Sequence, residues 1–206
     1  YTSQSNGLAN DDVLSLTCAE DGNVYVATAY GMSVLDTRTG IFATVCEPDE
    51  MVQESVTGIL VDSEGLVWLD ENGSLQVYDL KKGRLYTPEH PALTTVRSLI
   101  KDASGRVWAV NDRGLCKVSA VSSGDDGLDF NVVSFSFLQQ SDLHFNQRSA
   151  CLTKDGDFVI GSFSGYLRFS PERYVMDDSH ENANLHFVDL YVGNMKIVPG
   201  EEYDGE

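Results

Sequence analysis

The four histidines are the first side chains to test for chemistry, because imidazole is the commonest general base and metal ligand near neutral pH. His180 and His186 lie in one polar stretch near the end of the chain, but they share no motif. His90 lies between two prolines in "PEHPAL", which indicates a loop, and His144 in "SDLHFN" precedes a strand-like run. The chain also lacks the spacings that define a serine-hydrolase elbow, a zinc helix or a phosphate loop. The sequence therefore predicts no catalytic residue.

Carboxylates are abundant, and two of them at the right separation are enough for glycoside hydrolysis. Four aspartates recur at predicted turns beside a repeated glycine: Asp21, Asp62, Asp102 and Asp155. Aspartate at such a position accepts hydrogen bonds from nearby backbone N–H groups. We interpret these four as turn formers rather than as acids and bases, although the sequence does not exclude a catalytic pair elsewhere.

Three acidic clusters invite a test for calcium binding, and they lie at residues 11–12, 124–127 and 177–178. A calcium loop spaces its ligands at graded intervals, which these clusters lack. We interpret them as solvated loop charge. We therefore expect no metal, no cofactor and no cofactor-binding residue, and the sequence leaves the ligand-binding residues unknown.

The chain has four cysteines, with no CxxC pair and no metal-like spacing. Cys18, Cys116 and Cys151 lie inside apolar, strand-like runs. This pattern predicts that the three are buried and behave as small hydrophobic residues. The fourth, Cys46, follows a similar run, and cysteine usage does not decide the compartment.

The turns belong to a repeat. The phrase "DSEGLVW" at residues 62–68 returns as "DASGRVW" at residues 102–108, and its glycine also has counterparts in "AEDGNVYVAT" and "TKDGDFVIGS". Aligned on this glycine, the columns before and after it carry apolar or aromatic residues in all four copies. The third interval is lengthened by "SSGDDG" at residues 122–127, which predicts a loop insertion. The aligned glycines are Gly22, Gly65, Gly105 and Gly156.

Each copy is typical of short β-strands separated by tight turns. Four antiparallel strands in about 40 to 45 residues is the pattern of a propeller blade, whose sheet buries its faces against neighbouring blades. Tyr25, Trp68 and Trp108 occupy one column, and we expect them to pack between blades. The predicted fold class is therefore all-β, a partial β-propeller of about four blades. Closed propellers commonly have more blades, so we expect a piece of a longer propeller whose open faces promote self-association.

The predicted organisation follows from where the repeat stops. After "FSPERY" the chain becomes polar and turn-rich, and then "LHFVDLYVGNMKIVPGE" reads as two strands around a turn, either a new β domain or a last strand of the fourth blade. We place the blades within residues 1–175 (repeats near 7–48, 52–91, 92–138 and 139–175), a linker at 176–184 and the start of another β domain at 185–206.

Charge and hydropathy exclude several partners. The formal net charge is −18, and such an acidic surface repels nucleic-acid phosphates and anionic lipids. The sequence has no apolar run of about 18 residues, so we expect no membrane insertion by this segment. Its beginning lacks the pattern of a signal peptide.

These motifs resemble a known family. "D-x-x-G-x-V-W" followed by a glycine-led strand is similar to the regulator-propeller repeat, which builds the periplasmic sensor region of hybrid two-component systems in polysaccharide-degrading gut bacteria. "NGLANDDVLSL" resembles that family's connection into a new blade, and residues 145–171 resemble its final blade. Residues 185–201 resemble the first strands of the immunoglobulin-like domain that follows. The usual "W-I-G-T" is replaced here by "YVAT", "WLDE", "WAVN" and "VIGS".

The resemblance implies a periplasmic ligand-sensing segment that recognises an oligosaccharide and signals to a histidine kinase outside this chain. Its partners would be the rest of its own propeller, the immunoglobulin-like domain and, in the full-length protein, a second copy in a homodimer. No enzymatic activity is expected of this segment itself. Two alternatives stay open: a propeller enzyme acting on glycans as a hydrolase or lyase, and a scaffold propeller for protein partners.

Overall fold

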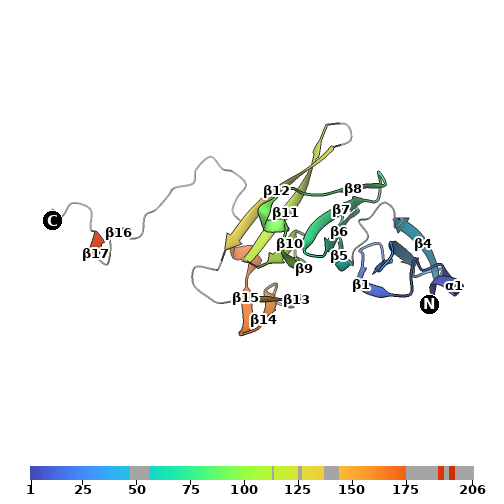
Figure 1. Cartoon of the computed structure of the whole chain (residues 1–206), viewed down its shortest axis with the longest axis horizontal. Coiled ribbons are helices and arrows are strands. Elements are labelled where there is room, and N and C mark those ends of the chain that lie inside the picture. Colours follow the sequence, from blue (N-terminus) through green and yellow to red (C-terminus); the bar gives the residue numbers. More distant parts are fainter. Residues whose placement is uncertain are drawn as a thin grey trace. The chain divides into compact units, whose positions relative to one another are not determined.

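The structure is a computed structural model that describes residues 1–46, 56–112, 114–124, 127–136, 144–174, 190–192 and 195–197. The chain divides into two compact units, residues 1–173 and 174–206. The first unit contains four antiparallel sheets that follow one another in chain order (Figure 1). The expectation of an all-β partial propeller is therefore confirmed.

The first two sheets each have four strands in sequential order. A short helix, α1 (Ser3–Asn6), precedes them. The strands of the first sheet are β1 (Val13–Cys18), β2 (Val24–Thr28), β3 (Met32–Asp36) and β4 (Ile41–Cys46). Those of the second are β5 (Val56–Val61), β6 (Leu66–Glu71), β7 (Ser74–Asp79) and β8 (Arg84–Tyr86).

A short 3-10 helix, η1 (Pro91–Leu93), leads into the third sheet, and a second one, η2 (Pro171–Tyr174), follows the fourth. The strands of the third sheet are β9 (Val96–Lys101), β10 (Val107–Asn111), β11 (Gly114–Ser123) and β12 (Gly127–Ser136). Those of the fourth are β13 (Phe145–Leu152), β14 (Phe158–Ser162) and β15 (Gly165–Phe169).

Two details of the blades differ from the sequence prediction. The insertion near residue 124 is more than a loop, because it lengthens β11 and β12 to 10 residues each and makes a hairpin that projects beyond its neighbours (Figure 1). Within the described residues, the fourth sheet has three strands instead of four. After β15 the chain enters η2 at Pro171, which has no N–H to donate to a ladder.

The core consists of three apolar layers, one between each pair of neighbouring sheets. Tyr25 packs between the first and second sheets, Trp68 between the second and third, and Trp108 between the third and fourth. The last two are almost fully buried, at 1% and 0% exposure. The prediction that this column of aromatics packs between blades is confirmed.

Two of the four repeated turns also anchor a tryptophan. The indole Nε1 of Trp68 donates to Asp62 Oδ2 at 2.7 Å, and that of Trp108 donates to Asp102 Oδ2 at 2.8 Å. The other carboxylate oxygen of each aspartate accepts two backbone N–H groups of the turn. The phrase D-x-x-G-x-V-W is repeated because one aspartate both closes the turn and orients the indole between the blades.

The N-terminal segment covers part of the outer face of the first sheet. Leu8 is buried there, Ala9 N donates to Ser33 Oγ at 2.9 Å, and the Tyr1 ring packs edge-on against Phe42 at 5.4 Å. Leu16 on the same sheet is 59% exposed, and Tyr166 on the fourth sheet is 71% exposed. Self-association through such faces stays a prediction.

Two cysteines contradict the prediction of burial. Cys116 is buried in the third sheet, whereas Cys18 and Cys151 are exposed. Cys18 and Cys151 lie on the first strands of the two end sheets. Cys18 pairs with Val24 and Cys151 pairs with Val159 in the neighbouring strand, and both valines are only half-buried. An apolar strand pattern predicts burial only when both faces of the sheet are covered by a neighbour.

In the second unit, β16 (Leu190–Val192) and β17 (Met195–Ile197) form a two-stranded antiparallel sheet. The start of another β domain at 185–206 stays a prediction. The predicted linker at 176–184 lies outside the described residues.

Candidate binding cleft

The propeller unit carries a cleft of about 610 Å³ where the third and fourth sheets meet. Its volume falls within the usual range of small-molecule sites. It lies on the face formed by the beginnings of β9 and β13 and by the turns that follow β10 and β14. The residues that line it are Arg97, Asp112, His144, Phe145, Asn146, Gln147 and Phe163.

The turn between β14 and β15 presents an aromatic ring at the rim of the cleft. Phe163 is 85% exposed, although phenylalanine is usually buried. Its backbone N–H donates to His144 O at 3.1 Å, which ties the turn to the beginning of β13. Phe145 is buried beneath, at 4% exposure. The rim therefore offers a flat apolar surface on an anchored backbone.

An ion pair lines another part of the cleft. Arg97 Nε donates to Asp112 Oδ1 at 2.7 Å, and both side chains are partly exposed. This hydrogen bond raises the pKa of Arg97 above its ordinary value. Arg97 is therefore charged at every physiological pH, and Asp112 holds its planar guanidinium in a fixed orientation.

A β-bulge places Arg97 in the cleft. In the ladder between β9 and β10, Ser98 lies opposite Val110 and Val96 lies opposite Asn111, so Arg97 has no opposite residue. The first strands of the other sheets carry a bulge at the same level, with Leu14 and Thr57 as the extra residues of β1 and β5. Bulges turn side chains out of the ladder and are frequent beside functional sites.

In the fourth sheet this bulge is larger. The residues from Asn146 to Ser149 lie opposite the single residue Gly161. Ser149 Oγ donates to Asn146 O at 2.8 Å and closes the bulge. A Cβ on Gly161 would come within 3.1 Å of the Ser149 Cβ. The glycine therefore makes room for the bulge, which presents Asn146 and Gln147 to the cleft.

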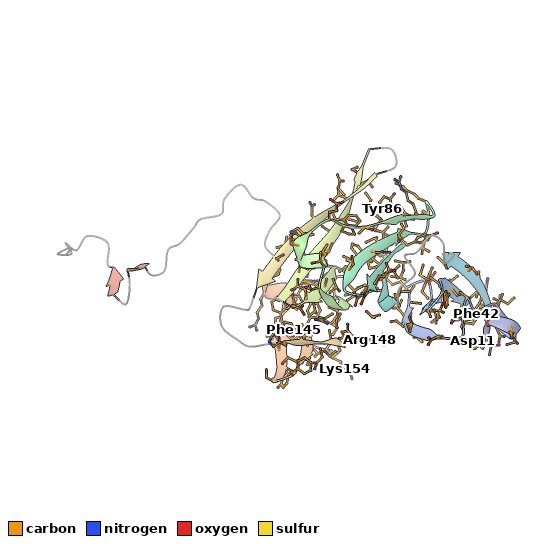
Figure 2. The ribbon with its side chains drawn as sticks, in the orientation of Figure 1. Asp11, Phe42, Tyr86, Phe145, Arg148 and Lys154 are labelled. Atoms are coloured by element: carbon orange, nitrogen blue, oxygen red, sulfur yellow. The ribbon has the colours of Figure 1, made fainter. Side chains whose placement is uncertain are left out.

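Arg148 lies at the end of this bulge with a backbone φ of 55°. This left-handed conformation costs a residue other than glycine about 1–2 kcal/mol. Figure 2 shows Arg148 on β13, the same strand as Phe145. Strain of this kind persists where the surrounding structure enforces it, and it is concentrated at functional sites.

A buried carboxylate of the second sheet lies within electrostatic reach of both arginines. Asp70 is 1% exposed, and it accepts from Thr57 Oγ1 at 2.6 Å and from Gly73 N at 2.9 Å. Burial raises its pKa, against the hydrogen bonds and the positive charges of Arg148 and Arg97. Asp70 thus closes the bulge of the second sheet through Thr57, and its carboxylate feels the positive charges of Arg97 and Arg148 electrostatically.

A second cavity, of about 490 Å³, lies beside η1 and the end of β12. His90 lines it, and its Nδ1 accepts the N–H of Ala92 at 3.1 Å, which caps η1. Pro91, Leu115 and Phe135 make much of its wall apolar. We take the first cleft as the candidate site because it combines an exposed ring, a fixed cation and amide side chains.

The residues considered from sequence have separate locations. His144 lines the cleft and His90 lies in the second cavity, whereas His180 and His186 lie outside the described residues. Within the part of the chain that the structure describes, no group of three or more His, Cys, Asp or Glu side chains is arranged to hold a metal ion. Sequence reasoning missed Arg97, Gln147 and Phe163; an aromatic residue in the turn "SFSG" was the one available signal.

No family model matches the chain, and no curated protein matches it. Among solved structures, the extracellular domain of the hybrid two-component system BT4673 from B. thetaiotaomicron superposes with a TM-score of 0.56 at 20% identity, covering 82% of this chain and 23% of that one. The corresponding domain of BT3049 from the same organism gives 0.56 at 20% identity, covering 81% and 21%.

An enzyme shares the fold at a similar level. A virginiamycin B lyase from Staphylococcus aureus, bound to quinupristin, gives a TM-score of 0.55 at 16% identity, covering 78% of this chain and 53% of that one. At these identities the comparisons establish the fold alone, a partial β-propeller. The chain spans less than a quarter of the two-component domains. None of the described helices is long and apolar enough to cross a membrane.

Proposed function

We propose that this chain is a ligand-sensing segment of the extracytoplasmic domain of a hybrid two-component protein, and that the cleft between its third and fourth sheets binds an oligosaccharide. One observation carries the proposal, namely that the exposed ring of Phe163 lines the same cleft as Asn146, Gln147 and Arg97. Sugars offer apolar C–H faces and many hydroxyl groups, which such a combination satisfies. The fold shared with extracellular domains of two-component proteins supports a sensing role.

The same proposal concerns the partners. In a longer protein, further blades of the same propeller would cover the outer sheet faces, and β16 and β17 would begin an immunoglobulin-like domain. A periplasmic location, a homodimer and a histidine kinase that receives the signal complete the scheme.

The test is binding without turnover. The full chain is titrated calorimetrically with oligosaccharides from partial digests of plant and animal polysaccharides, and each mixture is then analysed for cleaved products. Phe163→Ala is expected to weaken binding about tenfold, because the loss of an aromatic contact with the ligand costs on the order of 1.4 kcal/mol. Tyr166→Ala is the matched control, because Tyr166 is a comparably exposed aromatic residue of the same sheet and does not line the cleft.

Three results would contradict the proposal. Binding of no oligosaccharide would remove the sensing role, and equal effects of the two substitutions would move the site elsewhere. Cleavage of the sugar would favour the enzyme alternative, which is the reason for the product analysis, since a lyase shares the fold.

A further inference from the structure

The second cavity, beside η1 and the end of β12, shares a border with the candidate cleft. Arg97 and Asp112 line the cleft, whereas Thr95 and Asn111 line the second cavity. Asn111 and Asp112 are consecutive, so their Cα atoms are about 3.8 Å apart, and Thr95 and Arg97 have only one residue between them. The border between the two cavities is therefore formed by the entry of β9 and the turn after β10.

Hydrogen bonds hold this border in place. On the side of the cleft, Arg97 Nε donates to Asp112 Oδ1 at 2.7 Å. On the side of the second cavity, the buried Asn111 donates from Nδ2 to Ala92 O at 2.8 Å, which ties the end of β10 to η1. A ligand that extends from one cavity into the other would cross a preformed border, so it would not have to order that segment when it binds.

The second cavity differs from the cleft in charge. None of the described residues that line it is an Asp, Glu, Lys or Arg, although 22% of the chain consists of these four types. A charged group of a ligand would lose its hydration there without gaining a partner of opposite charge, which is costly. The cavity therefore favours an uncharged group.

The polar groups of the second cavity are neutral. His90 Nδ1 accepts the N–H of Ala92, so the proton of the neutral imidazole lies on Nε2, which can donate to a ligand. The hydroxyl groups of Thr95 and Ser134 have no hydrogen-bond partner among the described residues. Together with the apolar part of the wall, these groups match a neutral sugar residue, which presents C–H groups and hydroxyl groups side by side.

We propose that the second cavity is a further subsite for the ligand of the cleft. One sugar residue contacts Phe163, Asn146 and Gln147 in the cleft, and a second, uncharged residue of the same oligosaccharide occupies the cavity beside η1. This inference rests on the proposed function and specifies its ligand, an oligosaccharide long enough to span both cavities.

The experiment compares oligosaccharides of increasing length with variants in which the second cavity is filled. Size-separated fractions of the polysaccharide digests, from monosaccharides upward, are titrated calorimetrically into the full chain. Ser134→Trp and Thr95→Trp fill the cavity from two different segments, β12 and the entry of β9. Ser119→Trp is the matched control, because Ser119 is an exposed serine on the neighbouring strand β11 and lines neither cavity.

We expect the affinity to rise about 10- to 100-fold at the length that first reaches the second cavity, as for the added contacts of one sugar ring. Both filling variants are expected to remove this gain, and Ser119→Trp to keep it, with urea unfolding as the check that each variant is folded. Oxidation of the same oligosaccharides to uronic acids at their primary hydroxyl groups is expected to remove the gain from the unmodified chain, because it puts a carboxylate into the second cavity.

The outcomes separate the two proposals. Absence of the gain, a gain that survives both filling variants, or its loss in the control as well would overturn the second subsite and leave the oligosaccharide sensor intact. A gain that the oxidised series keeps would overturn the uncharged residue. Failure to bind any of the oligosaccharides would overturn both proposals.

Discussion

The repeated aspartate predicts unequal costs for the same substitution in two blades. Asp102 is almost fully buried, and its side chain accepts from Ser104 N (2.9 Å), Arg106 N (3.0 Å), Arg106 Nε (2.6 Å) and Trp108 Nε1 (2.8 Å). In Asp102→Asn one oxygen becomes an NH₂ group. In either orientation of the amide, its NH₂ group meets two hydrogen-bond donors that then lose their acceptor. These donors are the indole and the guanidinium in one orientation, and the two backbone N–H groups in the other.

The magnitude follows from the bonds lost. A hydrogen bond to a charged group contributes about 1.5–3 kcal/mol, and a buried donor left without a partner costs about as much. Two such bonds are lost at Asp102, so we expect Asp102→Asn to lower the free energy of unfolding by about 3–5 kcal/mol. Asp62 lacks the guanidinium, because Leu66 stands in place of Arg106, and its carboxylate is partly exposed. Water can satisfy the group there, and we expect Asp62→Asn to cost about 1–2 kcal/mol.

Urea unfolding measures both variants on one scale. Trp68 and Trp108 are the two tryptophans of the chain, so fluorescence reports on both anchored indoles. The midpoints are compared at equal slope, because a changed slope would signal a changed unfolded state. Equal costs at the two positions, or a change within about 0.5 kcal/mol for Asp102→Asn, would refute the assignment of the indole–carboxylate anchor.

Three other predictions concern strain, thiol chemistry and pH. Arg148→Gly is expected to raise the free energy of unfolding by about 1 kcal/mol, since glycine adopts positive φ freely; a destabilised variant in the same urea assay would contradict this. In a Cys46→Ser background, a thiol reagent is expected to modify Cys18 and Cys151 in the folded chain but spare Cys116, whose pKa burial raises to about 12; mass spectrometry of the labelled peptides decides. Burial raises the pKa of Asp70 above its value in the unfolded chain, so the folded state binds more protons, and stability falls as the pH rises from the unfolded to the folded pKa. Asp70→Asn is expected to remove this pH dependence of stability, as measured by urea midpoints across that pH interval.

The sequence was most informative where a residue type is required by backbone geometry. The repeated glycines marked the turns, and the Asp and Trp columns marked the layers between blades, because one aspartate serves both turn and indole. The burial of side chains in the first and fourth sheets, at the two ends of the propeller unit, was not predictable in this way. Cys18 and Cys151 have the strand pattern of buried residues, but their exposure depends on whether another sheet covers them.

The site was less accessible to sequence reasoning, for a physical reason. Arg97 reaches the cleft because a bulge shifts the ladder by one residue, and Arg148 lies at the end of a larger bulge. A bulge leaves no periodic signal in the sequence, because the alternation of buried and exposed side chains along the strand resumes after it. Gly161 was a visible consequence of the bulge, but a strand glycine alone does not say which side chain the bulge presents.

The departures from the repeat connect the cleft with the end of the propeller unit. Arg106 replaces the Leu66 of the previous blade, and its Nη2 donates to Glu172 Oε1 at 2.6 Å in η2, next to the boundary with the second unit. The same guanidinium binds Asp102, which holds Trp108 against Phe158 and Phe169 of the fourth sheet. Both sheets that form the cleft are therefore joined to η2 by one chain of contacts. Replacing Arg106 with Leu, the residue of the second blade, removes that connection together with one hydrogen bond to buried Asp102, so we expect it to lower the free energy of unfolding by about 1.5–3 kcal/mol. A change in cleft binding by the variant while it is still folded would show that the two ends of these sheets are coupled, and unchanged binding would contradict the coupling.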